Sequence, residues 1–153
     1  MYGVWNTILC RQFPHDNGYI TRPQDRHTNQ RGEHGFSDFH TFQRFPDNSV
    51  SKFLIVQCKR GGLEDSVRAW NQGIQQLNRY LGAIHGTRQP HERTPAYGIL
   101  AVGQMMRVYQ YDDVSRTVRP TRIIGGGAPG AKLHLENNPE TIQTILNHIR
   151  DHH

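Results

Sequence analysis

The clearest pattern of apolar residues in the chain has the period of an α-helix. Apolar side chains recur three and four residues apart between Val67 and Ile84, the spacing that keeps them on one face of a helix. The acidic residues Glu64 and Asp65 precede this stretch, and acids are favoured at the start of a helix. Glycine commonly ends a helix. We therefore predict a long amphipathic helix that begins near Leu63, with Glu64 and Asp65 in its first turn, and ends near Gly86.

Two strands are predicted before this helix. Residues 53–58 are almost entirely apolar, which is typical of a strand buried on both faces. Residues 36–42 carry an aromatic side chain at every third position and also indicate a strand. Between them, Pro46-Asp47-Asn48-Ser49 is a turn signature, because proline presets φ and Asp or Asn side chains bond their own backbone. We predict that the two strands form a hairpin.

The second half of the chain predicts another hairpin and a last helix. Residues 97–102 are apolar, residues 106–111 alternate, and Gly103-Gln104 between them suggests a tight turn. Further along, Asn138-Pro139 is a favourable helix start, with Asn as the cap and Pro at the first helical position. Residues 132–135 indicate one more short strand.

The N-terminal part has a weaker pattern. Residues 1–10 could form a short helix or an edge strand, and the prolines and glycines within residues 14–35 indicate loop. We predict a single α/β domain, residues 1–153, with a central mixed β-sheet flanked by helices. Its three parts are an irregular N-terminal region (1–35), a core (36–112), and a loop with the C-terminal helix (113–153).

Charge and cysteine content narrow the class of protein. The 153 residues carry a net charge of +5, and a basic balance suits a polyanionic partner such as nucleic acid. Two cysteines are too few for a disulfide framework. Neither a signal peptide nor a membrane-spanning run is visible. We therefore expect an intracellular protein of the cytoplasm or nucleus that has no membrane association, and a homo-oligomer is compatible with this composition.

A cluster of polar residues at the end of the buried strand is the best candidate for chemistry. Side chains alternate along a strand, so Gln57 and Lys59 point the same way and Cys58 points opposite. Asp38 lies one hairpin strand earlier and could sit beside this pair. A carboxylate, a second oxygen ligand and a lysine suit metal-assisted phosphodiester cleavage. In such a reaction the lysine orients water or neutralises phosphate.

This arrangement resembles the PD-(D/E)XK, or restriction-endonuclease-like, nuclease superfamily. The pattern of that family is an acid on one strand, (Asp/Glu)-x-Lys on its hairpin partner, and then a long helix. The resemblance covers residues 36–112 and includes the hairpin found after the helix in many fungal members. It implies a restriction-endonuclease-like core and a nuclease dependent on Mg²⁺ or Mn²⁺. Asp38 and Gln57 would be its metal ligands, and Lys59 would orient water or stabilise charge.

The long helix carries a second feature of the resemblance. Gln76 and Tyr80 form a Gln-x-x-x-Tyr motif similar to the one in RecB-type nucleases, and residues four apart share one helix face. Small residues on that face, including Gly73, would let the helix approach the sheet. The two polar side chains would then contact the site or the substrate, as would Arg60 beside the strand end. Alternatively, Gln76 and Tyr80 only border the core.

Two departures from the family pattern matter. Gln57 stands where the family usually has an acid, and an amide oxygen brings no charge to a cation. Residues 1–12 contain no acid, although many members carry a Glu on a helix before the first strand, and Glu33 is the only nearby candidate. Asp47 is an alternative ligand, although we interpret it as a turn residue. The alternative function is therefore a catalytically impaired nuclease-fold module that binds nucleic acid or protein. An enzyme unrelated to nucleic acid is a third class.

Overall fold

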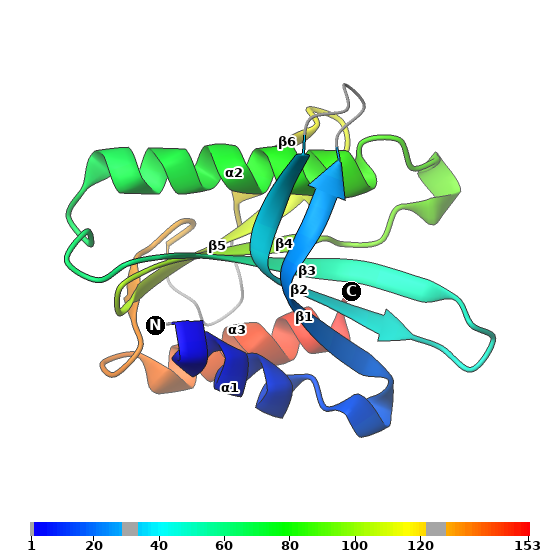
Figure 1. The fold of residues 1–153 in the computed structure, drawn as a ribbon, viewed down its shortest axis with the longest axis horizontal. Helices are drawn as coiled ribbons and strands as arrows, with labels where there is room; N and C mark the ends of the chain where they lie inside the picture. The colour runs from blue at the N-terminus through cyan, green and yellow to red at the C-terminus, as the bar shows by residue number, and fades with distance from the viewer. Residues whose placement is uncertain (1, 29–33, 122–127) are drawn as a thin grey trace.

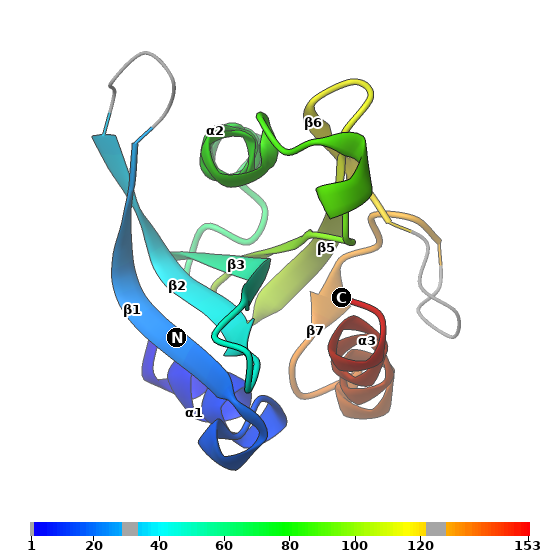
Figure 2. The same cartoon turned by 90° about the vertical axis from the view of Figure 1, so that its right-hand side faces the viewer.

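The computed structural model describes residues 2–28, 34–121 and 128–153, and for residues 25–28 and 34–36 it describes the backbone alone. A twisted β-sheet forms the middle layer, with α2 on one face and α1 and α3 on the other (Figure 1, Figure 2). The elements in chain order are α1 (Tyr2–Gln12), η1 (His15–Asn17), β1 (Tyr19–Thr28), β2 (His34–Arg44), β3 (Val50–Lys59), α2 (Val67–His85), η2 (Pro90–Glu92), β4 (Tyr97–Val102), β5 (Met105–Asp112), β6 (Thr117–Pro120), β7 (Leu133–His134) and α3 (Pro139–Asp151).

The sheet is mixed, as the sequence predicts. Within the described residues it has seven strands in the order β1-β2-β3-β4-β5-β6, and β7 pairs with β5. The strands β3 and β4 are parallel, and the other neighbours are antiparallel. A parallel pair needs a crossover connection, and α2 supplies it. The α/β class and the helix-flanked mixed sheet are thus confirmed.

A β-bulge interrupts the β2–β3 hairpin. Near the turn Phe42 faces Lys52, but beyond the irregularity Thr41 faces Leu54, so Phe53 is the extra residue. Both Phe53 and Leu54 consequently join the apolar cluster beneath α1 and α3. From Ile55 onward, odd-numbered β3 residues face α2.

The predicted turn between β2 and β3 is confirmed. Asp47 Oδ1 accepts hydrogen bonds from the Ser49 backbone N–H at 2.9 Å and from the Ser49 hydroxyl at 2.6 Å. The exposed Asp47 side chain therefore closes the turn. About 20 Å of strand separates Asp38 from the end of β2 at Arg44, which precedes this turn. Asp47 is thus a turn residue and lies away from the candidate site.

The long predicted helix is also confirmed, with a later start. Its first residue is Val67, and the Ser66 hydroxyl caps it by accepting a bond from the Ala69 N–H at 3.2 Å. Gly73 lets α2 approach the sheet, because a Cβ at this position would lie 2.3 Å from Leu100 Cδ1. The small-residue face predicted from the sequence therefore does contact the sheet.

The N-terminal region differs from the prediction, because residues 1–35 are not irregular. They contain the helix α1, which buries Trp5 and Leu9, and the ten-residue strand β1. Pro23 indicated a loop, yet it lies within β1 and is the partner of Phe39 on β2. The reason is that β1 is the edge of the sheet, where a residue without an N–H leaves no neighbouring strand unpaired.

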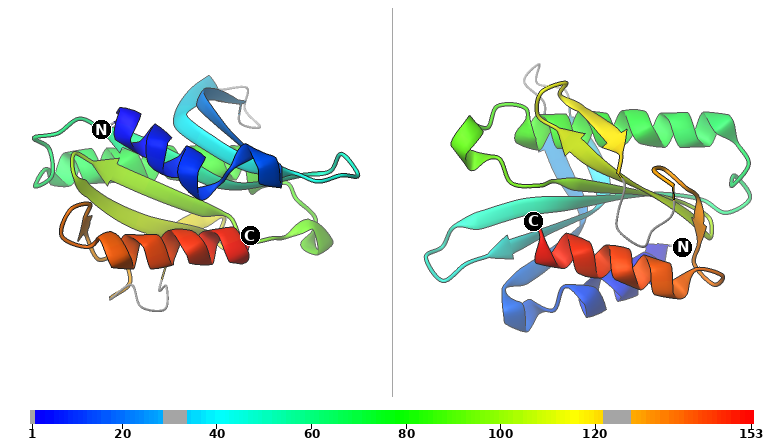
Figure 3. Two further views of the ribbon diagram at one scale, coloured as in Figure 1. Left: turned by 90° about the horizontal axis from the view of Figure 1, so that it is seen from below. Right: turned by 180° about the vertical axis from the view of Figure 1, so that it is seen from behind.

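The C-terminal half follows the prediction except at β6, a strand that pairs with β5 in a region predicted as loop. The β4–β5 hairpin turns at Gly103, whose φ is +53°. The helix α3 begins at Pro139 after Asn138, and it lies beside α1 on the same face of the sheet (Figure 3). None of the helices in the described part of the chain is both long and apolar enough to span a membrane.

Candidate functional site

The register of β2 and β3 places Asp38 directly opposite Gln57. Phe39 faces Val56, so the preceding residue of β2 meets the following residue of β3. The Gln57 amide Nε2 donates a hydrogen bond to Asp38 Oδ2 at 2.5 Å, and the Cys58 backbone N–H donates to the same oxygen at 2.6 Å. The predicted proximity of Asp38 and Gln57 is therefore observed.

Gln57 presents one unsatisfied oxygen at this site. Its side chain is 5% exposed. Its Nε2 bonds Asp38, but its buried Oε1 accepts no hydrogen bond from any residue that the structure describes. Leaving a buried acceptor unpaired costs about 1–3 kcal/mol, so such groups are expected to have a water, an ion or a ligand as partner. The amide oxygen is therefore available as a ligand to a cation.

Lys59 lies two residues further along the same face of β3 and points to α2. Its ammonium Nζ donates to Oε1 of Gln76, which lies in the middle of that helix. Both side chains are half-buried. A hydrogen bond of this kind holds a flexible lysine in one direction, so Gln76 positions the positive charge. The Gln-x-x-x-Tyr motif thus does bring its glutamine to the strand end.

Tyr80 has a different place from Gln76. It is buried, and its hydroxyl accepts a bond from Arg79 Nη2 at 3.0 Å. The Arg79 guanidinium also lies 5.0 Å above the tyrosine ring. Arg60 follows directly after β3 and is exposed. Arg79 is exposed as well.

Burial sets the electrostatics of Asp38. Desolvation raises the pKa of its carboxyl above the usual value, and the Cys58 N–H and the charge of Lys59 oppose that rise. The neutral Gln57 amide cannot offset the cost of the carboxylate charge as a cation would. A positively charged ligand at this position would therefore stabilise the ionised carboxylate.

The donor set suits a weakly held hard cation. One carboxylate and one amide oxygen are oxygen ligands of the kind that Mg²⁺ accepts, with the remaining positions filled by water or phosphate. Among the residues that the structure describes, no group of three or more His, Cys, Asp and Glu side chains could hold a metal. The helix α1 contributes no acid, and Glu33 lies outside the described residues.

The sequence did not predict the contact between α1 and the strand that carries Asp38. The Tyr2 hydroxyl donates to the backbone carbonyl of Asp38 at 3.0 Å, and its ring lies 4.3 Å from that of Phe39. No spacing pattern signals such a contact, because it joins residues 36 positions apart.

The site's chemistry therefore has to be argued from its own geometry. No protein family, curated protein or solved structure matches this chain.

Proposed function

We propose that this chain is a metal-dependent, restriction-endonuclease-like nuclease domain that hydrolyses phosphodiester bonds of DNA or RNA. The observation that supports the proposal is the convergence of Asp38, Gln57 and Lys59 on one sheet face. Oxygen ligands for a hard cation beside a positioned ammonium suit metal-assisted phosphodiester hydrolysis. The net charge of +5 favours the approach of a polyanion.

Each residue has a distinct role in this proposal. Asp38 supplies the only charged ligand, and the buried Gln57 Oε1 supplies a second oxygen. A bound Mg²⁺ or Mn²⁺ would polarise the phosphate and stabilise its developing charge. Lys59 binds a phosphate oxygen or orients the attacking water, and Gln76 keeps its ammonium in place. Arg60 contacts the neighbouring substrate backbone, whereas the buried Tyr80 acts through Arg79, whose guanidinium donates a hydrogen bond to its hydroxyl.

The first test is a cleavage assay on plasmid, single-stranded DNA and RNA with Mg²⁺ or Mn²⁺. Lys59→Ala and Asp38→Asn are each expected to reduce the rate by about 100-fold or more, the usual effect of losing a group that acts in the reaction. Lys52→Ala is the matched control, because Lys52 is an exposed lysine at the other end of β3. Circular dichroism confirms that each variant is folded. Equal rates in all four proteins would rule out the site.

The alternative, a catalytically impaired module that binds nucleic acid, has one observation in its favour. The Gln57 amide donates to Asp38, so the pair is already satisfied in part without a cation. This alternative predicts salt-dependent binding of nucleic acid and no cleavage.

Gln57→Glu separates the two functions. Restoring the acid places a second carboxylate beside Asp38, and the repulsion between them is relieved by a divalent cation. If the wild-type protein cleaves, the variant should cleave at a lower Mg²⁺ concentration. If both the wild-type protein and the Gln57→Glu variant bind nucleic acid but cleave nothing, the chain is the inert module.

A further inference from the structure

A second polar pocket lies at the C-terminal end of α2, away from the site described above. It has a volume of about 260 Å³ and is walled by the loop that follows α2 and by the end of β5 with the turn after it. The titratable side chains in its wall are His85, Arg88, Arg93, Tyr111, Asp113 and Arg116. Three of these six are arginines, so the balance of charge in the pocket depends on how they are paired.

One of the three guanidinium groups is neutralised by a carboxylate. Arg88 donates from Nε and Nη2 to the two carboxylate oxygens of Asp113, both at 2.8 Å, and its side chain is 9% exposed. This two-point pairing makes a rigid wall. Neither Arg93 nor Arg116 has an ion pair with a described residue. The end of α2 adds only about half a negative charge, so the pocket remains positive.

His85 adds no charge to this balance. It is buried, and desolvation together with the charge of Arg88 lowers the pKa of its imidazole to about 3. At neutral pH the ring is uncharged, and the excess positive charge resides on Arg93 and Arg116.

Tyr111 supplies the observation that points to a ligand. Its side chain is 4% exposed, yet its buried hydroxyl has no hydrogen-bond partner among the described residues. Tyr111 and Gly86 both line the pocket, and the hydroxyl lies close to Gly86, since a Cβ on that residue would be 3.6 Å from it. An unpaired buried donor is costly, and a bound acceptor would satisfy it.

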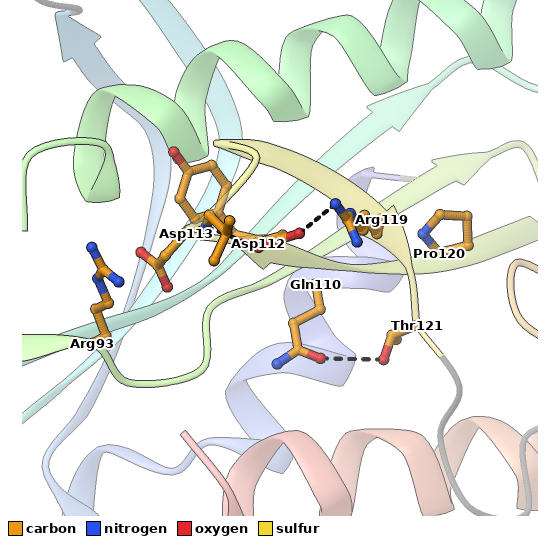
Figure 4. Close-up of a pocket in the computed structure, with 9 residues that line it drawn as sticks. Arg93, Gln110, Asp112, Asp113, Arg119, Pro120 and Thr121 are labelled. Atoms are coloured by element: carbon orange, nitrogen blue, oxygen red, sulfur yellow. Dashed lines mark hydrogen bonds and ion pairs between the residues drawn. The ribbon is translucent and has the colours of Figure 1, made fainter. Parts of the chain in front are cut away.

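Arg93, Tyr111 and Asp113 also line a second, larger pocket. That pocket has a volume of about 650 Å³. Figure 4 shows Arg93 and Asp113 on one side of it and the hydrogen-bonded pair Gln110 and Thr121 on the other.

We propose that the Tyr111 hydroxyl and the guanidinium groups of Arg93 and Arg116 bind a phosphate group, either free phosphate or a phosphate of a nucleic-acid chain. The tyrosine donates one hydrogen bond, and the two arginines neutralise the oxyanion. Arg88 does not bind the ligand and instead holds the carboxylate of Asp113. This inference does not rest on the proposed nuclease activity.

The test is isothermal titration of the full chain with inorganic phosphate and, separately, with a single-stranded oligonucleotide lacking terminal phosphates. EDTA is present, so that no metal site contributes. Tyr111→Phe removes one hydrogen bond to a charged ligand and is expected to weaken phosphate binding about tenfold. Without ligand, Tyr111→Phe should be at least as thermally stable as wild type, since it lacks the unpaired hydroxyl. The Arg93→Ala/Arg116→Ala double variant should weaken binding further.

The control is Arg68→Ala, which removes an exposed charge near the other end of α2. Weaker inorganic phosphate binding in the pocket variants alone supports a site for free phosphate. Weaker oligonucleotide binding alone, with no affinity for inorganic phosphate, supports a site for backbone phosphate. If the pocket variants and Arg68→Ala behave alike toward both ligands, the proposal is wrong. A cleavage defect of Lys59→Ala is scored independently, so either proposal can fail without the other.

Discussion

The two faces of the sheet differ sharply in what they bury. Beneath α1 and α3 lies an apolar cluster that includes Phe39, Phe53, Leu54 and Val56. Beneath α2 the apolar cluster is joined by polar groups, namely Asp38, Gln57, Lys59, His85 and Tyr111. The α1/α3 face also buries some polar groups, such as the Trp5 indole Nε1 and the Gln12 side chain, but the polar groups of both candidate sites lie on the α2 face or at its end.

The difference teaches where stability and candidate function reside. Buried polar groups cost free energy unless they are paired. A face that keeps unpaired polar groups therefore loses stability, and a ligand that pairs with them would explain why they are there. Both candidate sites lie on the α2 face or at its end. We therefore expect substitutions beneath α1 and α3 to affect folding, and substitutions beneath α2 to change pH dependence and ligand binding.

The largest expected effect is on the apolar face. Phe53→Ala removes a fully buried ring that contacts Phe13 and Tyr19, and it should lower the free energy of unfolding by about 3–5 kcal/mol. Urea denaturation measures this loss. The exposed neighbour Lys52→Ala should change it by less than about 0.5 kcal/mol. A small effect of Phe53→Ala would mean that the bulge residue is not part of the core.

The second effect tests the polar face through His85. Its pKa falls from 6.5 to about 3 on folding, so the stability it contributes is fully present above about pH 6.5 and is lost as pH falls toward 3. Below the unfolded-state pKa, each pH unit lowers the free energy of unfolding by about 1.4 kcal/mol. Between pH 7 and pH 4 the free energy of unfolding of wild type should therefore fall by about 3 kcal/mol more than that of His85→Gln. Urea denaturation at both pH values gives the difference. Equal losses would show that His85 is not buried in its neutral form.

A third effect concerns the approach of α2 to the sheet. Gly73→Ala places a methyl group against the buried Leu100, and overpacking costs about 1–3 kcal/mol against a helix-propensity gain of about 1 kcal/mol. A net loss of about 1 kcal/mol is expected in thermal or urea denaturation. Gly82→Ala on the same helix meets nothing within 4 Å and should be stabilising by up to about 1 kcal/mol. Similar results for both variants would contradict the close contact at Gly73.

The smallest effect is the titration of Asp38. Burial raises the pKa of its carboxyl, so the stability associated with its protonated form is present below about pH 3.8 and is lost as pH rises through the folded-state pKa. Asp38→Asn removes this titration and should gain stability relative to wild type as pH rises from 3 to 7. Added Mg²⁺ should narrow the gap if the carboxylate binds a cation. A variant that instead loses relative stability over this range would show that the ionised carboxylate is favoured by its surroundings.

Local patterns predicted most of the regular structure, because they depend on neighbours in the chain. The period of α2, the turn at Asp47 and the start of α3 at Pro139 are all of this kind. The strand β1 escaped prediction because Pro23 is tolerated only at a sheet edge, and no local pattern tells which strand will be the edge.

The candidate site was predicted in part. Alternation along a strand places Gln57 and Lys59 on one face, and Gln76 shares a helix face with Tyr80. The pocket of Arg93, Tyr111 and Arg116 was not predicted, because its residues come from segments without a common pattern. Chain folding alone brings them together.

By itself, the sequence determined the helices α2 and α3, the β2–β3 and β4–β5 hairpins, and the face that Gln57 and Lys59 share on β3, since these follow from spacing and local propensity. Only the tertiary structure decided whether Asp38 and Gln57 meet. The register near the β2–β3 turn, continued unchanged, would pair Asp38 with Val56 and set Gln57 on the opposite face. The extra residue Phe53 shifts that register by one, because its ring is accommodated in the core beneath α1 and α3.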